Sequence, residues 1–269
     1  MKRPIPAFTL VLCLVLPTVN SCGGREAASS ESSRELARSA TERVRSNFNY
    51  QDFKFRLRIT RSFPNGTQYS KTFQFFGIIG ATESRVFAES ISGPSTESSR
   101  YLMLFRDGKL ISAKMSSASM GEMETREDDS DLNKITFGNL SYPEFRHMIA
   151  LRPEDFDDAS DGSNYVVLRS HVEETVDGEF EESRASRFVY YIDRESYLPA
   201  RIEFFNQREK FKEFVLAAKE RIGDKWVVRS GKVKDFIDQS ETLLEFEDVR
   251  LDEGVDASVF SEQRLRTRQ

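Results

Sequence analysis

"DFKFRLRIT", residues 52–60, is the stretch that decides the fold. Four apolar residues alternate in it with charged and polar ones: Phe53, Phe55, Leu57 and Ile59. Because successive side chains of a strand point to opposite faces, this period of two predicts a β-strand with one apolar and one solvated face. The apolar face meets either the protein's own core or an apolar ligand, and the alternation fits both.

Other segments of the chain have the length and apolar content of strands. With residues 52–62, they are 68–79, 84–92, 100–105, 109–115, 164–172, 186–193, 200–206, 211–222, 226–237 and 241–251. Most of the connections are too short for a parallel crossover, so the sheet is predicted to be antiparallel. Strand twist accumulates in a sheet of this size and curls it. We therefore expect a mainly β (α+β) protein with about eleven strands and a few covering helices.

Three segments interrupt the strands. Residues 33–48 carry apolar residues at four-residue steps, which predicts an amphipathic helix. Residues 137–151, "FGNLSYPEFRHMIAL", begin with a glycine turn and continue as a short helix. Residues 116–134 are small and acidic, which predicts a flexible loop, either disordered or a mobile flap.

The composition limits the kinds of partner that the protein can recognise through its charge. The chain has 269 residues, of which 22 are phenylalanines, and its formal net charge is −5. So many phenylalanines favour a folded, aromatic-rich interior over disorder. Nucleic acid and anionic membrane surfaces attract basic proteins, so we expect neither to be recognised by charge.

The first 21 residues have the features of a secretory signal peptide. Lys2 and Arg3 precede an apolar run that is too short to span a bilayer. The segment ends in "VNSC", residues 19–22, which resembles the bacterial lipoprotein signal, in which the cysteine becomes acylated, for example with palmitate. Alternatively, an ordinary signal peptidase cuts after Ser21 and leaves Cys22 as an unpaired thiol in an oxidising compartment.

Lipidation removes that unpaired thiol, so we expect Cys22 to be the lipid anchor. Gly23 follows it in place of an aspartate, which favours the outer membrane over retention in the inner one. Residues 22–33 are small and polar and are expected to form a flexible tether. Residues 34–266 are expected to form a single domain.

The C-terminal half resembles a known family. "YYIDRESYLPARIEFF" (190–205), "WVVRSGKVKDF" (226–236) and "LLEFEDVRLDEGVDASVF" (243–260) are similar to outer-membrane lipoprotein-sorting proteins, the LolA/LolB-like group. The points of similarity are Asp193, Leu198, Pro199, Val249 and Phe260. "FGNLSYPEF" also resembles a family segment, with Glu144 where aspartate is more usual.

The resemblance implies a curved antiparallel half-barrel around an apolar cavity, with helices as a lid, that binds a lipid or an acyl chain. Aromatic side chains offer the largest area for lining such a cavity. The candidate lining residues are Phe53, Phe55, Leu57, Ile59, Phe73, Phe75, Phe214, Leu216, Leu244 and Phe246. A slip of one residue in strand register would point all of them away from the cavity. The alternative is that they form a closed, dry core.

The sequence carries no signature of catalysis, a cofactor or a metal site. Its two histidines, His147 and His171, have no second ligand at metal-binding spacing, and no nucleophile elbow, Walker loop or dinucleotide-binding glycine pattern occurs. Two groups of basic residues either face lipid headgroups at a cavity mouth or form cross-strand ion pairs. They are Lys54, Arg56 and Arg58, and Arg201, Lys210 and Lys212.

We therefore expect a non-enzymatic envelope lipoprotein that faces the periplasm and is anchored to the outer membrane. Its expected role is to bind a lipid or a lipoprotein acyl chain and help transport or sort it, with an envelope transporter or a carrier protein as partner. A second hypothesis is a scaffold or adaptor lipoprotein that docks on an envelope complex. An envelope hydrolase is a third, without a recognisable site.

Overall fold

A computed structural model describes residues 24–92, 99–106, 109–117, 121–126, 136–141, 144, 151, 153–170, 185–206 and 209–266. Within these residues, thirteen strands form one antiparallel sheet and two short strands form a separate hairpin. Cys22, His147 and His171, on which expectations were placed, lie outside the described residues.

The N-terminal half contains one long helix and eight strands among the described residues. They are α1 (Gly24–Asn47), β1 (Asp52–Ser62), β2 (Gln68–Ile79), β3 (Glu83–Ser92), β4 (Ser99–Arg106), β5 (Lys109–Ser117), β6 (Gly121–Arg126), β7 (Thr136–Phe137) and β8 (Leu140–Ser141). The C-terminal half adds seven strands and short helical segments. They are η3 (Pro153–Asp155), β9 (Phe156–Asp161), β10 (Tyr165–Ser170), β11 (Arg187–Asp193), β12 (Pro199–Phe205), β13 (Lys210–Ile222), β14 (Lys225–Asp235), β15 (Glu241–Leu251), η4 (Ala257–Phe260) and α3 (Glu262–Arg266).

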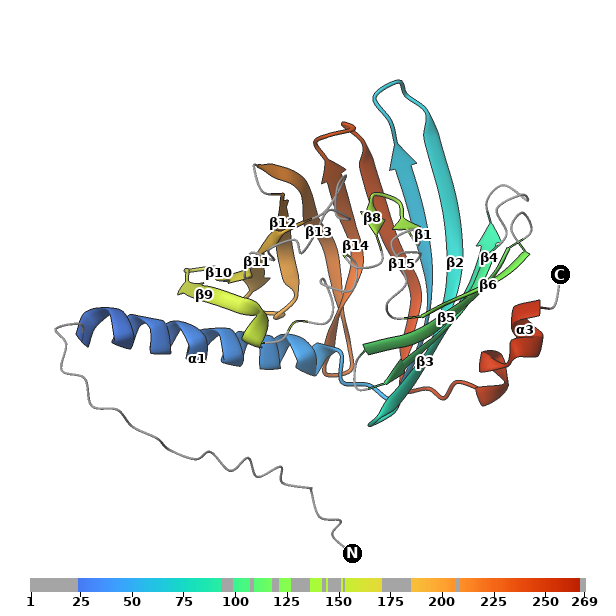
Figure 1. Cartoon of the computed structure of the whole chain (residues 1–269), viewed down its shortest axis with the longest axis horizontal. Coiled ribbons are helices and arrows are strands. Elements are labelled where there is room, and N and C mark those ends of the chain that lie inside the picture. The colour runs from blue at the N-terminus through green and yellow to red at the C-terminus, as the bar shows by residue number, and fades with distance from the viewer. Residues whose placement is uncertain are drawn as a thin grey trace, which may run out of the picture.

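The sheet is an open, curved wall. Its strand order is β6-β5-β4-β3-β2-β1-β15-β14-β13-β12-β11-β10-β9, so β6 and β9 are the two edges. Two meanders meet where the first strand, β1, pairs with the last, β15. Figure 1 shows the long central strands with α1 along one end of the sheet and α3 on the far side of β3 to β5. This is the curved antiparallel half-barrel that the sequence predicted.

One face of the sheet, which we call the inner face, carries most of the core. The α1 residues Ala37, Ala40 and Val44 are buried in the same apolar cluster as Leu57 of β1 and Phe214 of β13. The helix therefore uses its small side chains to approach the sheet closely. Ser33 joins it to β9, because its Oγ accepts from Ala159 N (2.6 Å) and donates to Ala159 O (3.0 Å).

The opposite, outer face is covered locally by the C-terminus. Phe87 of β3 is fully buried with Val259 and Phe260 of η4 and Leu265 of α3, and Phe76 of β2 packs against them. This explains why the second strand is apolar on both sides. Its Phe73 and Phe75 face the inner core, and Phe76 faces the C-terminal segment.

The structure corrects three expectations. Residues 24–33 were expected in a flexible tether but form the first turns of α1, which Ser33 ties to the sheet. The acidic segment 116–134 was expected to be a loop, yet residues 121–126 form β6, which pairs with β5. The two-stranded hairpin β7–β8 and the strand β9 were also missed.

None of the described helices has both the length and the apolar composition needed to cross a bilayer.

Candidate functional site

The inner face begins with the alternation in β1. Phe53, Leu57 and Ile59 are buried and Phe55 is half-buried. Register places Phe55 opposite Phe75 of β2, and their rings stack with centroids 4.9 Å apart. The Phe53 ring stacks on Phe55 in turn, at 5.4 Å. The apolar residues of β1 and β2 therefore form one continuous aromatic surface.

A glycine makes room for this surface. Gly77 of β2 lies opposite Phe53, and a Cβ at this position would overlap the Phe53 ring. Only glycine lets that ring lie flat across the neighbouring strand. On the other side of β1, Leu57 lies opposite Phe246 and Ile59 opposite Leu244 of β15.

All ten residues predicted to line a cavity lie on the inner face. They join one apolar cluster, seven of them buried and three half-buried: Phe53, Leu57, Ile59, Phe73, Phe75, Phe214 and Leu244, then Phe55, Leu216 and Phe246. The ten residues therefore belong to one apolar cluster. A role in holding a ligand remains a prediction, because in this structure the ten side chains pack against each other and against the elements that cover them.

The hairpin β7–β8 is one of those covering elements. Its Phe137 lies 6.3 Å from the Phe75 ring, centroid to centroid, and its Leu140 is fully buried. The turn between its strands contains Gly138, whose φ of +67° is a left-handed conformation that favours glycine. A Cβ there would overlap the Thr242 side chain of β15. The hairpin therefore sits against the inner face with no space between its turn and the sheet.

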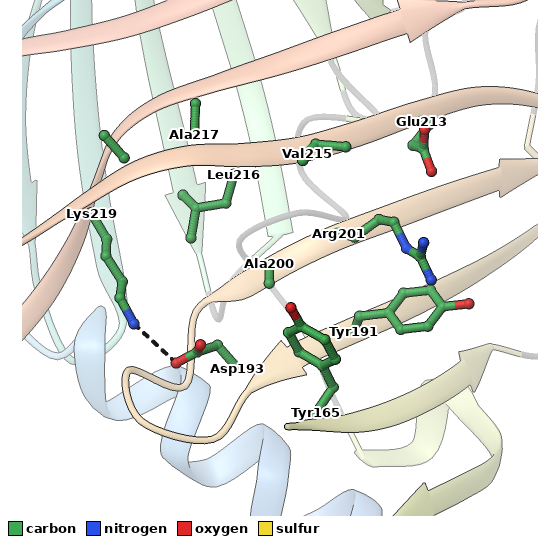
Figure 2. Close-up of a pocket in the computed structure, with 11 residues that line it drawn as sticks. Tyr165, Tyr191, Asp193, Ala200, Arg201, Glu213, Val215, Leu216, Ala217 and Lys219 are labelled. Atoms are coloured by element: carbon green, nitrogen blue, oxygen red, sulfur yellow. Dashed lines mark hydrogen bonds and ion pairs between the residues drawn. The ribbon is translucent and has the colours of Figure 1, made fainter. Parts of the chain in front are cut away.

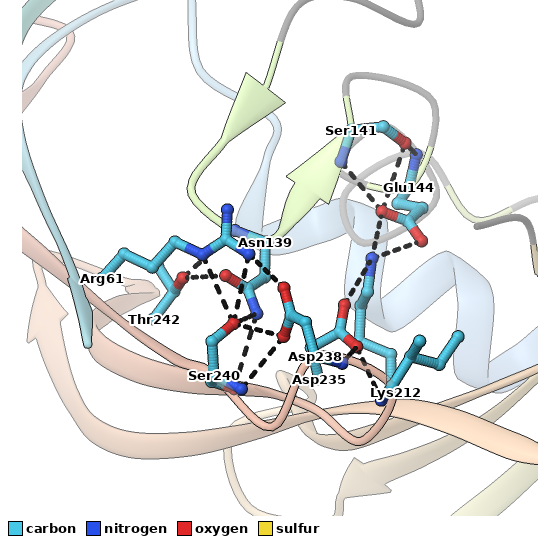
Figure 3. Close-up of polar contacts among 10 residues, drawn as sticks. Arg61, Asn139, Ser141, Glu144, Lys212, Asp235, Asp238, Ser240 and Thr242 are labelled. Carbon is cyan, nitrogen blue, oxygen red and sulfur yellow. Dashed lines mark hydrogen bonds and ion pairs between the residues drawn. The ribbon is translucent and has the colours of Figure 1, made fainter. Parts of the chain in front are cut away.

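Polar side chains fix the hairpin to β15 (Figure 3). Asn139 donates from its backbone N to Thr242 Oγ1 (3.1 Å), and Thr242 Oγ1 donates to Asn139 Oδ1 (2.8 Å). The Asn139 amide also donates to Ser240 Oγ (2.7 Å). All three residues are buried, so these hydrogen bonds are shielded from water.

A buried ion pair continues this arrangement. Lys212 Nζ of β13 lies 2.8 and 2.9 Å from the two carboxylate oxygens of Glu144, and both side chains are almost fully buried. Asp235 Oδ2 is a second, more distant carboxylate at 3.9 Å. Glu144 Oε2 also accepts from Ser141 N (2.8 Å), so the carboxylate links the end of the hairpin to the sheet. We call these groups, Asn139, Ser141, Glu144, Lys212, Ser240 and Thr242, the latch.

The β14–β15 turn holds Ser240 of the latch in place through Asp238. Asp238 Oδ1 accepts from Ser240 N (3.0 Å) and Ser240 Oγ, and its other oxygen pairs with Arg61 of β1. Burial alone would raise the pKa of Asp238, but the hydrogen bonds from Ser240 and the charge of Arg61 outweigh it and hold the pKa below its usual value. Asp238 is therefore ionised at neutral pH and orients Ser240 toward Asn139.

The basic residues are mostly ion-paired. Arg56 pairs with Asp248 and Arg58 with Glu247 (2.8 Å), both across the β1–β15 seam. Lys212 has a cross-strand ion pair, with Asp235 of β14 (3.9 Å), but it is buried, and its closer partner is Glu144 of the latch. Sequence reasoning missed that role, although it noted Glu144 as part of a family-like segment. Among the described residues, no cluster of three or more His, Cys, Asp or Glu side chains is placed to hold a metal ion.

Comparison with known proteins identifies the fold. A family model described only as "Uncharacterized protein" matches residues 152–267. No curated protein matches the chain in sequence. Three solved structures are similar to it: a DUF1329 family protein from Desulfovibrio piger (15% identity, TM-score 0.70, 88% of this chain and 99% of that one), a domain described as an outer membrane lipoprotein-sorting protein from Vibrio parahaemolyticus (13%, 0.69, 88% and 100%), and a LolA superfamily protein from Nitrosomonas europaea (13%, 0.59, 85% and 98%).

These likenesses extend over nearly the whole of each relative and most of this chain, at identities that carry fold information alone. Together with the open thirteen-stranded sheet of the described residues and the covered apolar inner face, they establish that the chain has the LolA-like half-barrel fold.

Proposed function

We propose that the protein is a cell-envelope lipoprotein that binds a lipid or an acyl chain on its inner face and helps its transport or sorting. The observation that carries the proposal is the convergence of ten apolar side chains, six of them phenylalanines, on one face of a curved sheet. Two of the similar structures bear names of lipoprotein-sorting or LolA superfamily proteins, which supports the same reading.

In this proposal the ligand displaces the β7–β8 hairpin from the inner face and does not enter a groove that is already open. Each methylene of an acyl chain that leaves water gains about 0.8 kcal/mol, so a long chain gains on the order of 10 kcal/mol when fully buried. The cost is mainly the exposure of Phe137 and Leu140, about 1.5–3 kcal/mol each, because Lys212 and Glu144 regain their hydration when they separate. The gain exceeds that cost, so a bound chain can replace Phe137 and Leu140 against the aromatic surface of β1 and β2.

The proposed location follows from the N-terminus. Cys22 carries the lipid anchor in the outer membrane, and the domain faces the periplasm. Because α1 begins at Gly24, the anchor is two residues from an ordered helix and not at the end of a long tether. The domain is therefore held close to the membrane surface. Partners are a lipid or acyl chain and an envelope transporter or carrier protein.

One experiment tests binding and a second tests the anchor. The Cys22→Ser chain, exported and purified without detergent, is examined by native mass spectrometry. We expect co-purifying lipid that is lost in Phe55→Asp, a half-buried position, and kept in Ile237→Asp, an exposed position in the β14–β15 turn. Thermal unfolding of both variants separates loss of binding from loss of fold. The unaltered chain should carry acyl groups that Cys22→Ser lacks.

A lipid-free mass, with no uptake of a fluorescent fatty acid by the folded protein, would favour the second function, a scaffold or adaptor lipoprotein. The observation behind that alternative is the burial of seven of the ten lining residues in a packed cluster.

A further inference from the structure

A hollow on the outer face lies where β12 and β13 separate. The two strands pair only as far as Arg201 and Val215, while β13 continues to Ile222 beside β14. The register of both strands shifts at this point. In β12 the shift lies between Pro199 and Arg201, which both pair with β11, and in β13 it lies between Leu216 and Lys219. Bulges bend strands, so these two strands diverge and leave a hollow of about 590 Å³ between them (Figure 2).

The hollow faces away from the aromatic inner surface. In the cross-strand row Tyr190, Ile202 and Phe214 the side chains are almost fully buried on the inner face. The neighbouring row, Tyr191, Arg201 and Val215, points to the other side and lines the hollow. A ligand here is therefore distinct from one on the inner face.

The walls of the hollow combine an apolar part with charged side chains. Tyr165 and Val215 are about two-fifths exposed (40% and 39%), unusual for large apolar side chains of this protein. Ala200, Ala217 and Ala218 add small apolar walls, and Leu216 forms a floor that also packs against the inner cluster. The volume lies within the ~300–1,000 Å³ of typical small-molecule sites. The apolar part of this lining can cover the hydrocarbon of an amphiphile, and the charged part can meet its head group.

Most charges around the hollow are paired at hydrogen-bonding distance. Asp193 accepts from Lys219 Nζ (3.1 Å) and from Ser196 N (2.7 Å). Burial alone would raise the pKa of Asp193, but these hydrogen bonds outweigh it and lower the pKa. Lys219 also pairs with Glu195 (2.9 Å), and Glu213 accepts from Lys210 (3.3 Å).

Arg201 is the charge with the most distant partner. Its guanidinium lies on the Tyr191 ring, 3.6 Å from the centroid, which fixes its plane. Its closest carboxylate oxygen, on Glu203, is 3.9 Å from Nε, and within the described residues Arg201 makes no hydrogen bond. A guanidinium has five N–H donors in a planar fork that fits a carboxylate or a phosphate. Tyr191 thus holds, at the rim of the hollow, a guanidinium whose N–H donors have no close acceptor among the described residues.

We propose that this hollow is a second binding site, for a single-chain anionic amphiphile whose carboxylate or phosphate head binds Arg201 and whose first methylenes lie on Val215, Leu216 and Tyr165. This goes beyond the proposed function, because the site is on the opposite face and does not require the latch to open.

Trp226 supplies the readout. It is the single tryptophan of the chain, and Lys219, which lines the hollow, lies 4.9 Å from its ring. The Cys22→Ser chain, free of detergent, is titrated with decanoate and with decyl phosphate while Trp226 fluorescence is recorded. We expect a saturable change with both. Acetate and inorganic phosphate test for a small-anion site, and octyl glucoside tests for a neutral amphiphile; each should bind at least about tenfold more weakly.

Arg201→Gln should weaken binding about tenfold, the loss of one charge-assisted hydrogen bond, and Arg201→Lys should retain part of it. Arg58→Gln removes a similarly exposed arginine of β1 and is the matched control. Ala217→Phe, which fills the hollow, should abolish the response in a protein with unchanged thermal unfolding.

The proposal would be overturned if Arg201→Gln and the unaltered protein bound decanoate and decyl phosphate with equal affinity. It would also be overturned if inorganic phosphate or octyl glucoside bound as tightly as these two probes. The inner-face function is tested separately. Phe55→Asp should leave the Trp226 response intact, and Arg201→Gln should leave the lipid seen by native mass spectrometry intact. Failure of either proposal therefore leaves the other standing.

Discussion

The buried Lys212–Glu144 pair makes a quantitative prediction about the latch. Replacing Glu144 by leucine leaves the Lys212 ammonium in the interior with only Asp235, at 3.9 Å, as a counter-charge. Replacing Lys212 by methionine, of similar shape, leaves the Glu144 carboxylate buried with hydrogen bonds from Ser141 alone. Removing one partner of a buried pair costs on the order of 3–5 kcal/mol. We expect each single variant near 3 kcal/mol, because each keeps a residual partner.

The double variant behaves differently. Glu144→Leu with Lys212→Met leaves no buried charge of the pair, and two apolar side chains of similar volume replace it. Such replacements are often neutral, so we expect the double variant within about 1–2 kcal/mol of the unaltered protein. The coupling energy of the cycle is then at least about 3 kcal/mol, the upper end for residues in direct contact.

Urea unfolding of the four proteins measures the cycle, and hydrogen exchange of the Asn139 amide, which donates to Thr242, reports the latch itself. The single variants should expose this amide more than they change exchange in β1. Additive effects, with a double variant near 6 kcal/mol, would show that the pair is not a coupled buried unit and refute the reasoning.

Four further results are expected. Gly138→Ala should loosen the hairpin, because alanine is strained at a φ of +67° and its Cβ would overlap Thr242; faster exchange at residue 139 checks this. Leu57→Ala should destabilise by about 2–5 kcal/mol in urea unfolding, since Leu57 is fully buried. The lowered pKa of Asp193 adds stability above its unfolded value, about 3.9, that is lost as the pH falls through the folded value, so Asp193→Asn should flatten the acid limb of a pH–stability curve. The raised pKa of Lys219 adds stability that is lost only as the pH rises above about 10.4, so Lys219→Met should flatten the alkaline limb instead.

The sequence predicts strands most clearly where apolar and polar residues alternate. In residues 52–60, apolar and polar residues take opposite faces without a break, so the inner-face side chains of β1 were predictable, and antiparallel pairing extended the prediction to β2 and β15. The second apolar face of β2 packs against the C-terminal segment, a contact that the alternation of residues does not specify.

The missed strands lack that alternation. β9, "FDDASD", buries only Phe156 and Ala159, three residues apart, and β6, "GEMETR", is charged. Both are edge strands, which tolerate polar residues because one side has no neighbour. Their pairing with β10 and β5 decides their conformation.

The latch was unpredictable for a different reason. Glu144 and Lys212 are 68 residues apart, and Asn139 and Thr242 are 103 apart. Nothing in the local pattern of either segment specifies the other. The hollow beside Arg201 depends similarly on two bulges, which the residue alternation does not reveal.

The pairing of β1 with β15 has a consequence for biogenesis. Phe53 lies opposite Leu251, so the central strand pair of the sheet cannot form until a segment almost two hundred positions downstream has been synthesised. A ribosome or a translocon releases that segment near the end of synthesis, and until then the aromatic edge of β1 is unpaired and prone to aggregate. Large sequence separation also slows folding. A chain built this way can complete its sheet only after its last strand has been synthesised.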